Sequence, residues 1–497
     1  MMNKALPTLL LCILAFAATA RGQPPRPPNI LLIVSDDQRS DTIRALGNTY
    51  IDTPNLDRLV ARGSTFTRAM VANPVCISSR SEILTGASGF RNGASPFGAV
   101  MKPEMIFWGD VMRQAGYVTW YSGKWMNDGA PKTRGYDETS ALYTSDNTGK
   151  TTKATYPTAY NGAPVTGFGD WSFKTNDGNA EPEKGIGLTP ITDRHIADGA
   201  ITLIERRPER PFFLHVNFTA PHDPRHFPPG YEKKYDPATI PLPPNFLSEH
   251  PFDHGNANQR DEKLLPLPRN PAEVKAEIAA YYAVISHLDE QIGRMIEALR
   301  TTGQDRNTII IFTSDHGLAI GSHGLLGKQN MYEHTLGVPL ILAGPGIPEN
   351  QRFAAQTYLR DLFPTVCDIV SAPLPVTVEG RSFLPVLKGH VREVYPEVYA
   401  YWHISSARAA KMAEAGRPAE LPIERMVRTE RWKLIYYSHL QRYQLFDLTN
   451  DPYELRDLSA AAEHQGVKAE LQRKLRAWFD PRIAPFNHGA NRQAQRR

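Results

Sequence analysis

Uninterrupted apolar runs alternate with amphipathic segments along most of the chain. The continuous apolar run at residues 29–34 (NILLIV) is typical of a strand buried on both faces of a sheet. Thr53 and Pro54 open a predicted helix, and residues 272–300 keep apolar positions at helical spacing. Further strands are predicted at residues 117–122, 212–218, 308–313 and 338–343. This alternation favours an α/β fold, with a large and mostly parallel sheet between helices.

The pattern changes between about residues 380 and 396. Beyond it, shorter alternating segments are separated by turn residues, which indicates a smaller antiparallel α+β unit packed against the main sheet. Its predicted strands span residues 425–429, 432–437 and 443–448, and its closing helix spans residues 471–479.

The N-terminus has the composition of an export signal. Lys4 supplies a positive start, Leu9 to Ala18 an apolar stretch, and Ala18 to Ala20 small residues for cleavage. A membrane anchor is the less favoured alternative because the stretch is short and a proline-rich linker follows. No later segment is apolar enough to span a membrane, so we expect an exported protein, periplasmic or secreted. The chain then divides into a signal peptide (1–22), a large α/β domain (23–385) and a C-terminal α+β subdomain (386–497).

Composition and charge narrow the class of protein. The chain is 41% hydrophobic and 22% charged, so it is globular, and its net charge is only +4 with no dominant basic run. This balance argues against nucleic acid as a partner. Cys76 and Cys367 are the cysteines left after the signal, so no disulfide framework is expected. Cys367 lies in an apolar helical pattern and is predicted to be buried, whereas Cys76 lies among small polar residues.

Two acidic segments follow two of the predicted strands. Asp36 and Asp37 come after residues 29–34, and Asp315 and His316 come after residues 308–313. Ligands in open parallel sheets bind beyond the carboxyl ends of the strands, so these four residues are expected to face one crevice. Three neighbouring carboxylates repel one another unless a cation lies between them, which predicts a divalent metal site. Either acidic pair taken alone is equally typical of helix caps or turns.

The segment from Cys76 to Gly86 (CISSRSEILTG) carries a specific pattern. It resembles the signature of the type I sulfatases, which is Cys-x-Pro-Ser-Arg followed by three residues and Leu-Thr-Gly. Ser78 stands where that family usually has proline. The resemblance implies an alkaline-phosphatase-like fold, an oxidised Cys76 in the form of formylglycine, a formylglycine-generating enzyme as partner, and a catalytic domain in residues 23–385.

Three further segments resemble the same family. They are Gly123-Lys124-Trp125, Pro221-His222, and Lys328 followed by Tyr332 and Glu333. The resemblance implies that Lys124, His222 and Lys328 bind the sulfate group; His226 is the alternative histidine. In all, the resemblance runs from about residue 28 to about residue 458.

The resemblance also implies a reaction. One hydroxyl of the formylglycine hydrate attacks sulfur, the alcohol leaves, and the second hydroxyl then expels sulfate and restores the aldehyde. Arg80, Lys124 and Lys328 stabilise the sulfate oxygens, and either His222 or Lys328 protonates the alcohol. The implied metal ligands are Asp36, Asp37, residue 76, Asp315 and His316. Their oxygen atoms suit Ca²⁺, while the imidazole also suits Mn²⁺ or Zn²⁺.

The preferred substrate is a sulfated carbohydrate, with a small sulfate ester as the alternative. Specificity is expected in residues 141–187 and 231–271, where the aromatic residues of the first loop either stack on sugar rings or form a small core of their own. These aromatics are Tyr143, Tyr156, Tyr160, Phe168 and Trp171. Two other functions stay open: hydrolysis of phosphonate monoesters or phosphodiesters at the same site, and non-catalytic binding of sulfated glycans.

Overall fold

The computed structural model describes residues 26–95, 100–145, 154–164, 167–257, 259–404 and 423–478. The signal peptide predicted for residues 1–22 lies outside these ranges. Within them, none of the helices combines the length and the apolar character that crossing a membrane requires.

A nine-stranded sheet forms the centre of the molecule. Its strands, in spatial order, are β5 (Trp171–Lys174), β4 (Glu138–Ser145), β3 (Val118–Lys124), β6 (Phe212–Asn217), β1 (Asn29–Ser35), β7 (Thr308–Ser314), β8 (Leu340–Ala343), β2 (Gly63–Met70) and β9 (Gln351–Tyr358). The neighbours of β1, β3 and β9 are all parallel to them, whereas β5 and β8 run antiparallel to theirs. The prediction of a mostly parallel sheet is confirmed.

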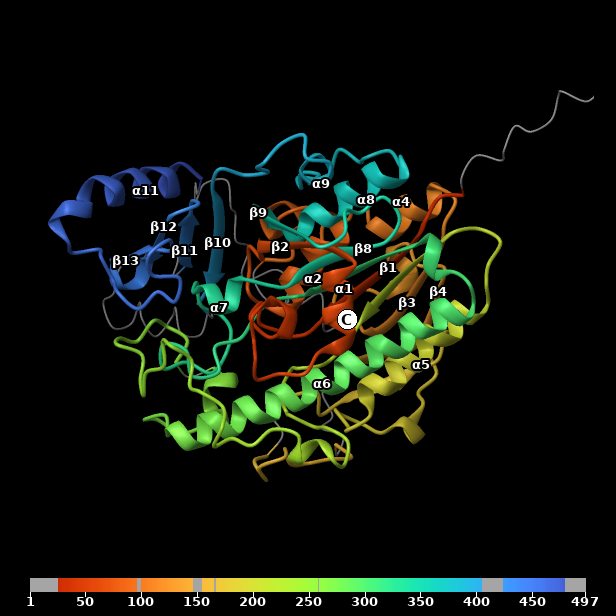
Figure 1. Cartoon of the computed structure of the whole chain (residues 1–497), viewed down its shortest axis with the longest axis horizontal. Helices are drawn as coiled ribbons and strands as arrows, with labels where there is room; N and C mark the ends of the chain where they lie inside the picture. The colour runs from red at the N-terminus through yellow and green to blue at the C-terminus, as the bar shows by residue number, and fades with distance from the viewer. Residues whose placement is uncertain are drawn as a thin grey trace, which may run out of the picture.

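Helices cover both faces of this sheet. Figure 1 shows the long helix α6 and its neighbour α5 side by side on one of these faces. One face carries α1 (Pro54–Ala61), α5 (Thr192–Glu205) and α6 (Pro271–Thr301). The other carries α2 (Cys76–Thr85), α4 (Trp108–Gln114), α8 (Leu362–Val370) and α9 (Leu384–Leu387), with the short helix α3 (Gly89–Asn92) beside α2. Strand β1 serves both layers, because Leu31 packs on the first face and Leu32 on the second. Each such buried side chain contributes about 1.5–3 kcal/mol to folding.

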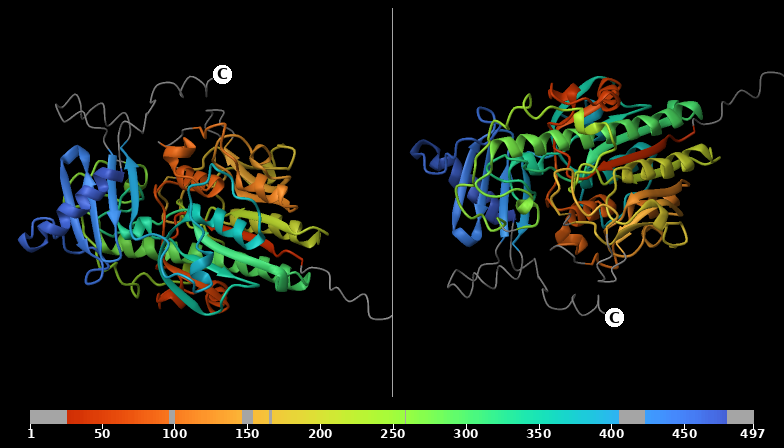
Figure 2. Two further views of the ribbon diagram at one scale, coloured as in Figure 1. Left: turned by 90° about the horizontal axis from the view of Figure 1, so that it is seen from above. Right: turned by 90° about the horizontal axis from the view of Figure 1, so that it is seen from below.

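A four-stranded antiparallel sheet lies at one end of the molecule (Figure 2). It consists of β10 (Val398–His403), β11 (Ile423–Arg428), β12 (Trp432–Tyr437) and β13 (Arg442–Asp447), with helix α11 (Gln465–Trp478) against its outer face. Its inner face belongs to the same hydrophobic core as α2 and α8, through residues such as Trp402 and Met426. The expected packing of an α+β unit on the main sheet is therefore confirmed, while the domain boundary at residue 385 stays a prediction.

Several elements differ from the predicted ones. Strands β2, β4, β5, β9 and β10 were not predicted. In β2 and β9 the apolar positions are interrupted by polar residues. Helix α11 begins at Gln465, before the predicted start at residue 471, because the mostly polar first turn gave no apolar signal in the sequence. The predicted end at residue 479 lies outside the described ranges. Thr53 precedes α1 as predicted, but its hydroxyl does not cap the helix. It accepts the N–H of Arg44 and donates to Asp57 instead.

Candidate active site

Two parallel strands bring the acidic residues together. The last residues of β1 and β7, Ser35 and Ser314, lie side by side in register, so Asp36 and Asp315 leave the sheet at the same edge. The N–H of Asp37 then donates to Asp315 Oδ1 at 3.0 Å. The prediction that both acidic segments face one crevice is therefore supported by the geometry.

Asp37 adopts a left-handed backbone conformation, with φ of 69°. Aspartate is among the few residues other than glycine that visit this region, at a modest cost. The hydroxyl of Tyr281, in α6, donates to the carbonyl oxygen of Asp37 at 2.6 Å and so holds the turn. The conformation directs the Asp37 carboxylate towards Lys328 and His316.

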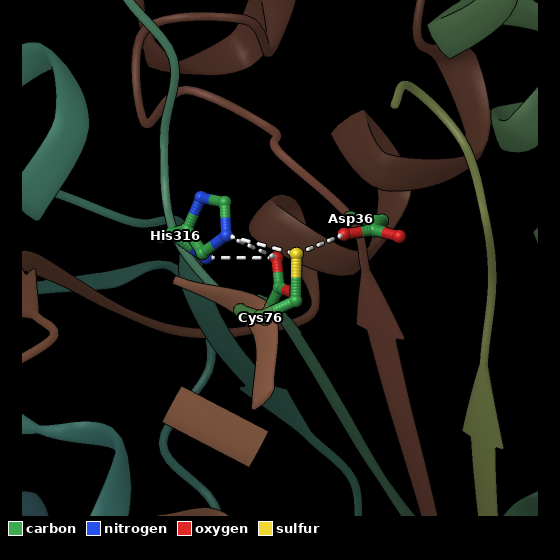
Figure 3. A group of neighbouring side chains, drawn as sticks. Asp36, Cys76 and His316 are labelled. Carbon is green, nitrogen blue, oxygen red and sulfur yellow. Dashed lines mark hydrogen bonds and ion pairs between the residues drawn. The ribbon is translucent and has the colours of Figure 1, made fainter. Parts of the chain in front are cut away.

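Cys76 is the first residue of α2 and is almost completely buried. Its Sγ lies 3.4 Å from Asp36 Oδ1 and 3.3 Å from His316 Nε2. Figure 3 marks both contacts with dashed lines. Lys328 Nζ approaches the same sulfur to 3.4 Å. The residue in the position of the expected nucleophile thus contacts both acidic segments and one of the predicted cations.

Each carboxylate of the site has a buried cationic partner. Arg80, one helical turn after Cys76, donates through Nε to Asp315 Oδ2 at 3.0 Å, and Lys328 Nζ lies 2.8 Å and 3.0 Å from the two oxygens of Asp37. Lys124, the last residue of β3, donates to Asp36 Oδ2. Burial alone raises the pKa of Asp36, but the charges of Lys124 and Arg80 outweigh it and hold that pKa well below its usual range.

His222 follows β6 and points at Lys328. Its Nε2 lies 3.1 Å from Lys328 Nζ, and its Nδ1 lies 3.2 Å from Asp223 Oδ1 and close to the carbonyl oxygen of Asp223. Burial, followed by the charge of Lys328, lowers the pKa of His222 well below its ordinary value, so the ring is neutral. The neutral ring donates from Nδ1 to Asp223 and accepts at Nε2. His226, the alternative histidine, lies outside this cluster beside Tyr156.

The donor set fits a divalent cation. Oxygen or nitrogen atoms of Asp36, Asp315 and His316 lie with Cys76 Sγ within 4.8 Å of one another, and Asp36, Asp37, Cys76 and His222 form an overlapping group. The Nδ1 of His316 lies 3.0 Å from the carbonyl oxygen of Gly317, to which it donates. Its Nε2 lone pair therefore faces the Asp37 carboxylate at 3.3 Å. Two acceptors at this distance require a cation or a proton between them.

The sequence that forms this site also matches the model of a known protein family. The sequence model of the family described as "Sulfatase" matches residues 28–372, well over half of the chain. The chain belongs to the sulfatase family. A second model, described as "N-sulphoglucosamine sulphohydrolase, C-terminal", matches residues 321–480 of this sulfatase, which include the four-stranded sheet.

Named relatives of the sulfatase agree with this assignment. Arylsulfatase K of Bos taurus is 27% identical over 495 residues, which cover 94% of this chain and 85% of the relative. An N-acetylglucosamine-6-O-sulfatase of Bacteroides thetaiotaomicron is 27% identical over 534 residues, which cover 94% and 90%. The sulfatase is therefore a sulfuric ester hydrolase.

A solved structure shares the fold of the sulfatase. The phosphonate monoester hydrolase SpPMH from Silicibacter pomeroyi superimposes with a TM-score of 0.75 at 23% identity, and the match covers 90% of this chain and 94% of that one. At this identity the likeness shows the fold alone. It confirms the expected alkaline-phosphatase-like architecture.

Three charged residues of the sulfatase site were missed by sequence reasoning. Arg260 Nη2 bonds Asp223 Oδ1 at 3.0 Å and lies 3.4 Å from His222 Nε2, while Asp261 Oδ2 lies 4.0 Å from Lys328 Nζ. Asp223 directly follows His222, a predicted site residue, and this adjacency was the one sequence feature that could have indicated its place in the site. Arg260 and Asp261 lie in a long segment with little regular structure, where neither spacing nor periodicity marks a residue.

The aromatic residues of segment 141–187, where specificity is expected, mostly form a core of their own. Tyr143 is fully buried and packs against Phe168, Trp171 and Phe173, with ring centroids 4.9–6.1 Å apart. Phe168 also contacts the site, because its ring lies edge-on to His222 and 4.8 Å from Lys124 Nζ. Within the described part of this loop, Phe168 thus links the small core to the predicted sulfate-binding residues.

Asp193, in α5, holds the segment that carries His222. Its Oδ1 accepts the N–H of Thr219 at 2.8 Å and the hydroxyl of Thr219 at 3.0 Å. Burial raises the pKa of Asp193 from 3.8 to about 6 although these hydrogen bonds lower it. The folded state therefore binds this proton more tightly than the unfolded state does.

We predict that Asp193 makes stability depend on pH. Its stabilising contribution is fully present below about pH 4 and is lost as the pH rises through about 6, a change of up to about 3 kcal/mol. In Asp193→Asn, which keeps the accepting Oδ1 without the ionisation, the slope of unfolding free energy between pH 4 and 7 becomes flatter. Urea unfolding at a series of pH values measures this slope, and an unchanged slope would contradict the assignment.

Proposed function

We propose that this sulfatase hydrolyses sulfate monoesters of carbohydrates, with a formylglycine made from Cys76 as the nucleophile. The observation that carries the proposal is the position of Cys76 at the start of α2, where its Sγ contacts Asp36, His316 and Lys328. Oxidation of a cysteine at this point puts the new hydroxyl groups of the hydrated aldehyde among the cations that are expected to bind sulfate. The formylglycine-generating enzyme is the partner that this requires.

The metal of the proposed site is calcium, held by Asp36, Asp37, Asp315 and His316 together with residue 76. When bound, the cation stabilises negative charge on the sulfate and lowers the pKa of the attacking hydroxyl. Three carboxylates are hard ligands that suit calcium, while the nitrogen of His316 keeps manganese and zinc as alternatives. The remaining roles belong to side chains of the chain itself.

The cations bind and orient the sulfate group in this proposal. A lysine ammonium has three N–H donors, so Lys124 retains donors for sulfate oxygens beyond the one given to Asp36. Lys328 contacts Asp37, His222 and Cys76, and it exchanges one of these contacts for a sulfate oxygen when substrate binds. Arg80 is held by Asp315 and fixes the positive charge beside residue 76. These preorganised donors stabilise the charge that develops on oxygen as the S–O bond breaks.

Lys328 supplies the proton to the leaving alcohol in this proposal. The Nδ1–H of His222 is directed at Asp223, so its Nε2 is an acceptor facing Lys328 at 3.1 Å. In the free enzyme the proton therefore resides on Lys328 Nζ. His222 accepts from it and orients the donor towards the alcohol oxygen.

A carbohydrate is proposed as the substrate because one relative bears the name N-acetylglucosamine-6-O-sulfatase. A small sulfate ester remains the alternative, and the name of arylsulfatase K is consistent with it. The proposed location is outside the cytoplasm, periplasmic or secreted, on the strength of the composition of residues 1–22.

Two substrates test the reaction class. We expect kcat/KM for 4-nitrophenyl sulfate to exceed that for 4-nitrophenyl phenylphosphonate by about 100-fold, which corresponds to about 2.7 kcal/mol of transition-state stabilisation. Both esters are monoanionic and share a leaving group, so the comparison isolates the group that is attacked. The reverse order favours phosphonate monoester hydrolysis, and binding without turnover of either ester favours the non-catalytic alternative.

A further inference from the structure

Lys328 lies in an irregular segment between β7 and α7 (Glu333–Leu336), where no helix or strand fixes its position. The next residue, Gln329, has φ of 72°, which is a costly conformation for a residue of this type. A side chain that must contact Asp37, His222 and Cys76 simultaneously needs its backbone held more firmly than this local sequence provides. The holding groups come from a distant segment.

Glu262 binds the backbone immediately before Lys328. Its Oε2 accepts the N–H of Leu326 at 3.0 Å, and its Oε1 accepts the N–H of Gly327 at 2.9 Å. The two segments approach so closely that a Cβ at Gly327 would lie 2.7 Å from Asp261 Cβ. Both oxygens of one carboxylate are therefore committed to two consecutive peptide groups.

Arg269 fixes the Glu262 carboxylate in turn. Its Nη2 donates to Glu262 Oε2 at 2.6 Å, and its Nη1 donates to the carbonyl oxygen of Glu262 at 2.9 Å. Both side chains are almost completely buried, at 1% and 4% exposure. A buried and fully bonded ion pair is rigid, because moving either partner leaves an uncompensated charge.

Asn256 binds the backbone immediately after Lys328. Its Nδ2 donates to the carbonyl oxygen of Gln329 at 2.9 Å, and its Oδ1 accepts the indole N–H of Trp402 at 3.1 Å. Trp402 belongs to β10, so this contact anchors Gln329 to the four-stranded sheet. Lys328 is thus held on one side by Glu262 and on the other by Asn256.

We propose that Glu262, assisted by Asn256, is a positioning residue for Lys328 and acts on catalysis through that lysine alone. The carboxylate sets the direction of the peptide from which the Lys328 side chain leaves the backbone. It touches neither the predicted metal ligands nor the predicted nucleophile. The inference rests on the proposed function, in which Lys328 protonates the leaving alcohol.

The leaving group provides a readout that a purely structural role would not change. 4-Nitrophenolate is a good leaving group that departs readily without protonation, whereas the more basic phenolate depends more on proton donation by Lys328. In Glu262→Gln we expect kcat for phenyl sulfate to fall about 100-fold and kcat for 4-nitrophenyl sulfate about 10-fold, so that their ratio changes about 10-fold. Asn256→Ala is expected to change the ratio of the two kcat values in the same direction. This variant tests the proposal if Glu262→Gln does not fold.

Asp289 provides the matched control. This buried carboxylate of α6 accepts the N–H groups of Asn55 and Leu56 at 3.0 Å and 2.8 Å, the same arrangement outside the site. Asp289→Asn is expected to lower the melting temperature without changing the ratio of the two kcat values. An unchanged ratio in folded Glu262→Gln and Asn256→Ala, or an equal change in Asp289→Asn, would overturn the proposal.

Lys328→Ala separates this proposal from the function on which it rests. If Lys328→Ala changes the ratio and the Glu262 and Asn256 variants do not, the positioning role is wrong while the acid role stands. If Lys328→Ala leaves the ratio unchanged, Lys328 is not the acid, and both the assignment and the positioning role that depends on it are wrong.

Discussion

Replacing Cys76 with alanine is expected to lower kcat for 4-nitrophenyl sulfate by about 10⁴–10⁶-fold, the range seen when an enzyme loses its covalent nucleophile. Alanine provides neither an aldehyde nor a hydroxyl group, while Arg80, Lys124 and Lys328 keep their carboxylate partners. Substrate binding should therefore persist without turnover. Steady-state kinetics on protein from a host with formylglycine-generating machinery measures the effect.

Cys367 is the matched control for Cys76. It is completely buried in α8 and belongs to the hydrophobic core, so Cys367→Ala should cost stability without abolishing activity. Cys76→Ser tests the need for two hydroxyls on one carbon, since serine has a single hydroxyl. It should release at most one equivalent of alcohol and then stop.

Peptide mass spectrometry across residue 76 decides whether the modification occurs. An aldehyde mass shows that Ser78, which stands in the usual proline position, is tolerated by the modifying enzyme. An unmodified thiol in protein that hydrolyses sulfate esters at full rate would rule out the formylglycine proposal. An unmodified thiol in inactive protein would favour the non-catalytic alternative.

Removing a proposed metal ligand is expected to have the second largest effect. Asp315→Asn keeps an oxygen that can accept the N–H of Asp37, but it lacks the charge that binds a cation and pairs with Arg80. We expect the metal content to fall and kcat/KM to drop by about 10³-fold, since several kcal/mol of transition-state stabilisation depend on the cation. Elemental analysis of the purified protein measures the metal independently of activity.

Asp361 is the matched control for Asp315. This buried carboxylate accepts the N–H groups of Tyr358 and Arg381 at 2.7 Å and 2.8 Å, outside the site. Asp361→Asn should leave the metal content unchanged. Chelation of the wild-type enzyme, followed by addition of calcium, manganese or zinc, identifies the metal that restores activity. Full metal content and activity in Asp315→Asn would contradict the ligand assignment.

The site residues that the sequence predicted are all marked by local sequence features. Asp36 and Asp315 directly follow apolar strands, and Cys76 lies in a contiguous pattern that ends at Gly86, so each signal is local. Parallel strands place their carboxyl ends at one edge of a sheet, which makes the convergence of two such segments predictable. The structure brings the predicted site residues together at this edge, although Lys328 reaches it from an irregular segment and Arg80 from α2. The roles of these residues are proposals.

The groups that hold and complete the site were decided by the tertiary structure alone. Glu262 binds backbone N–H groups 64 and 65 residues further along the chain, and Asn256 binds a carbonyl oxygen 73 residues away. The atoms that they bind are peptide groups, which are the same in every residue, so no side chain marks the partner. Glu262 lies in a single short 3-10 turn and Asn256 in a loop, and neither is long enough to have a hydrophobic period that indicates which way a side chain points. The sequence by itself determined the apolar strands that precede the acidic segments, the signature, and the set of candidate site residues. Which carboxylate fixes Lys328, and which residues complete the surroundings of His222, depended on long-range packing of loops.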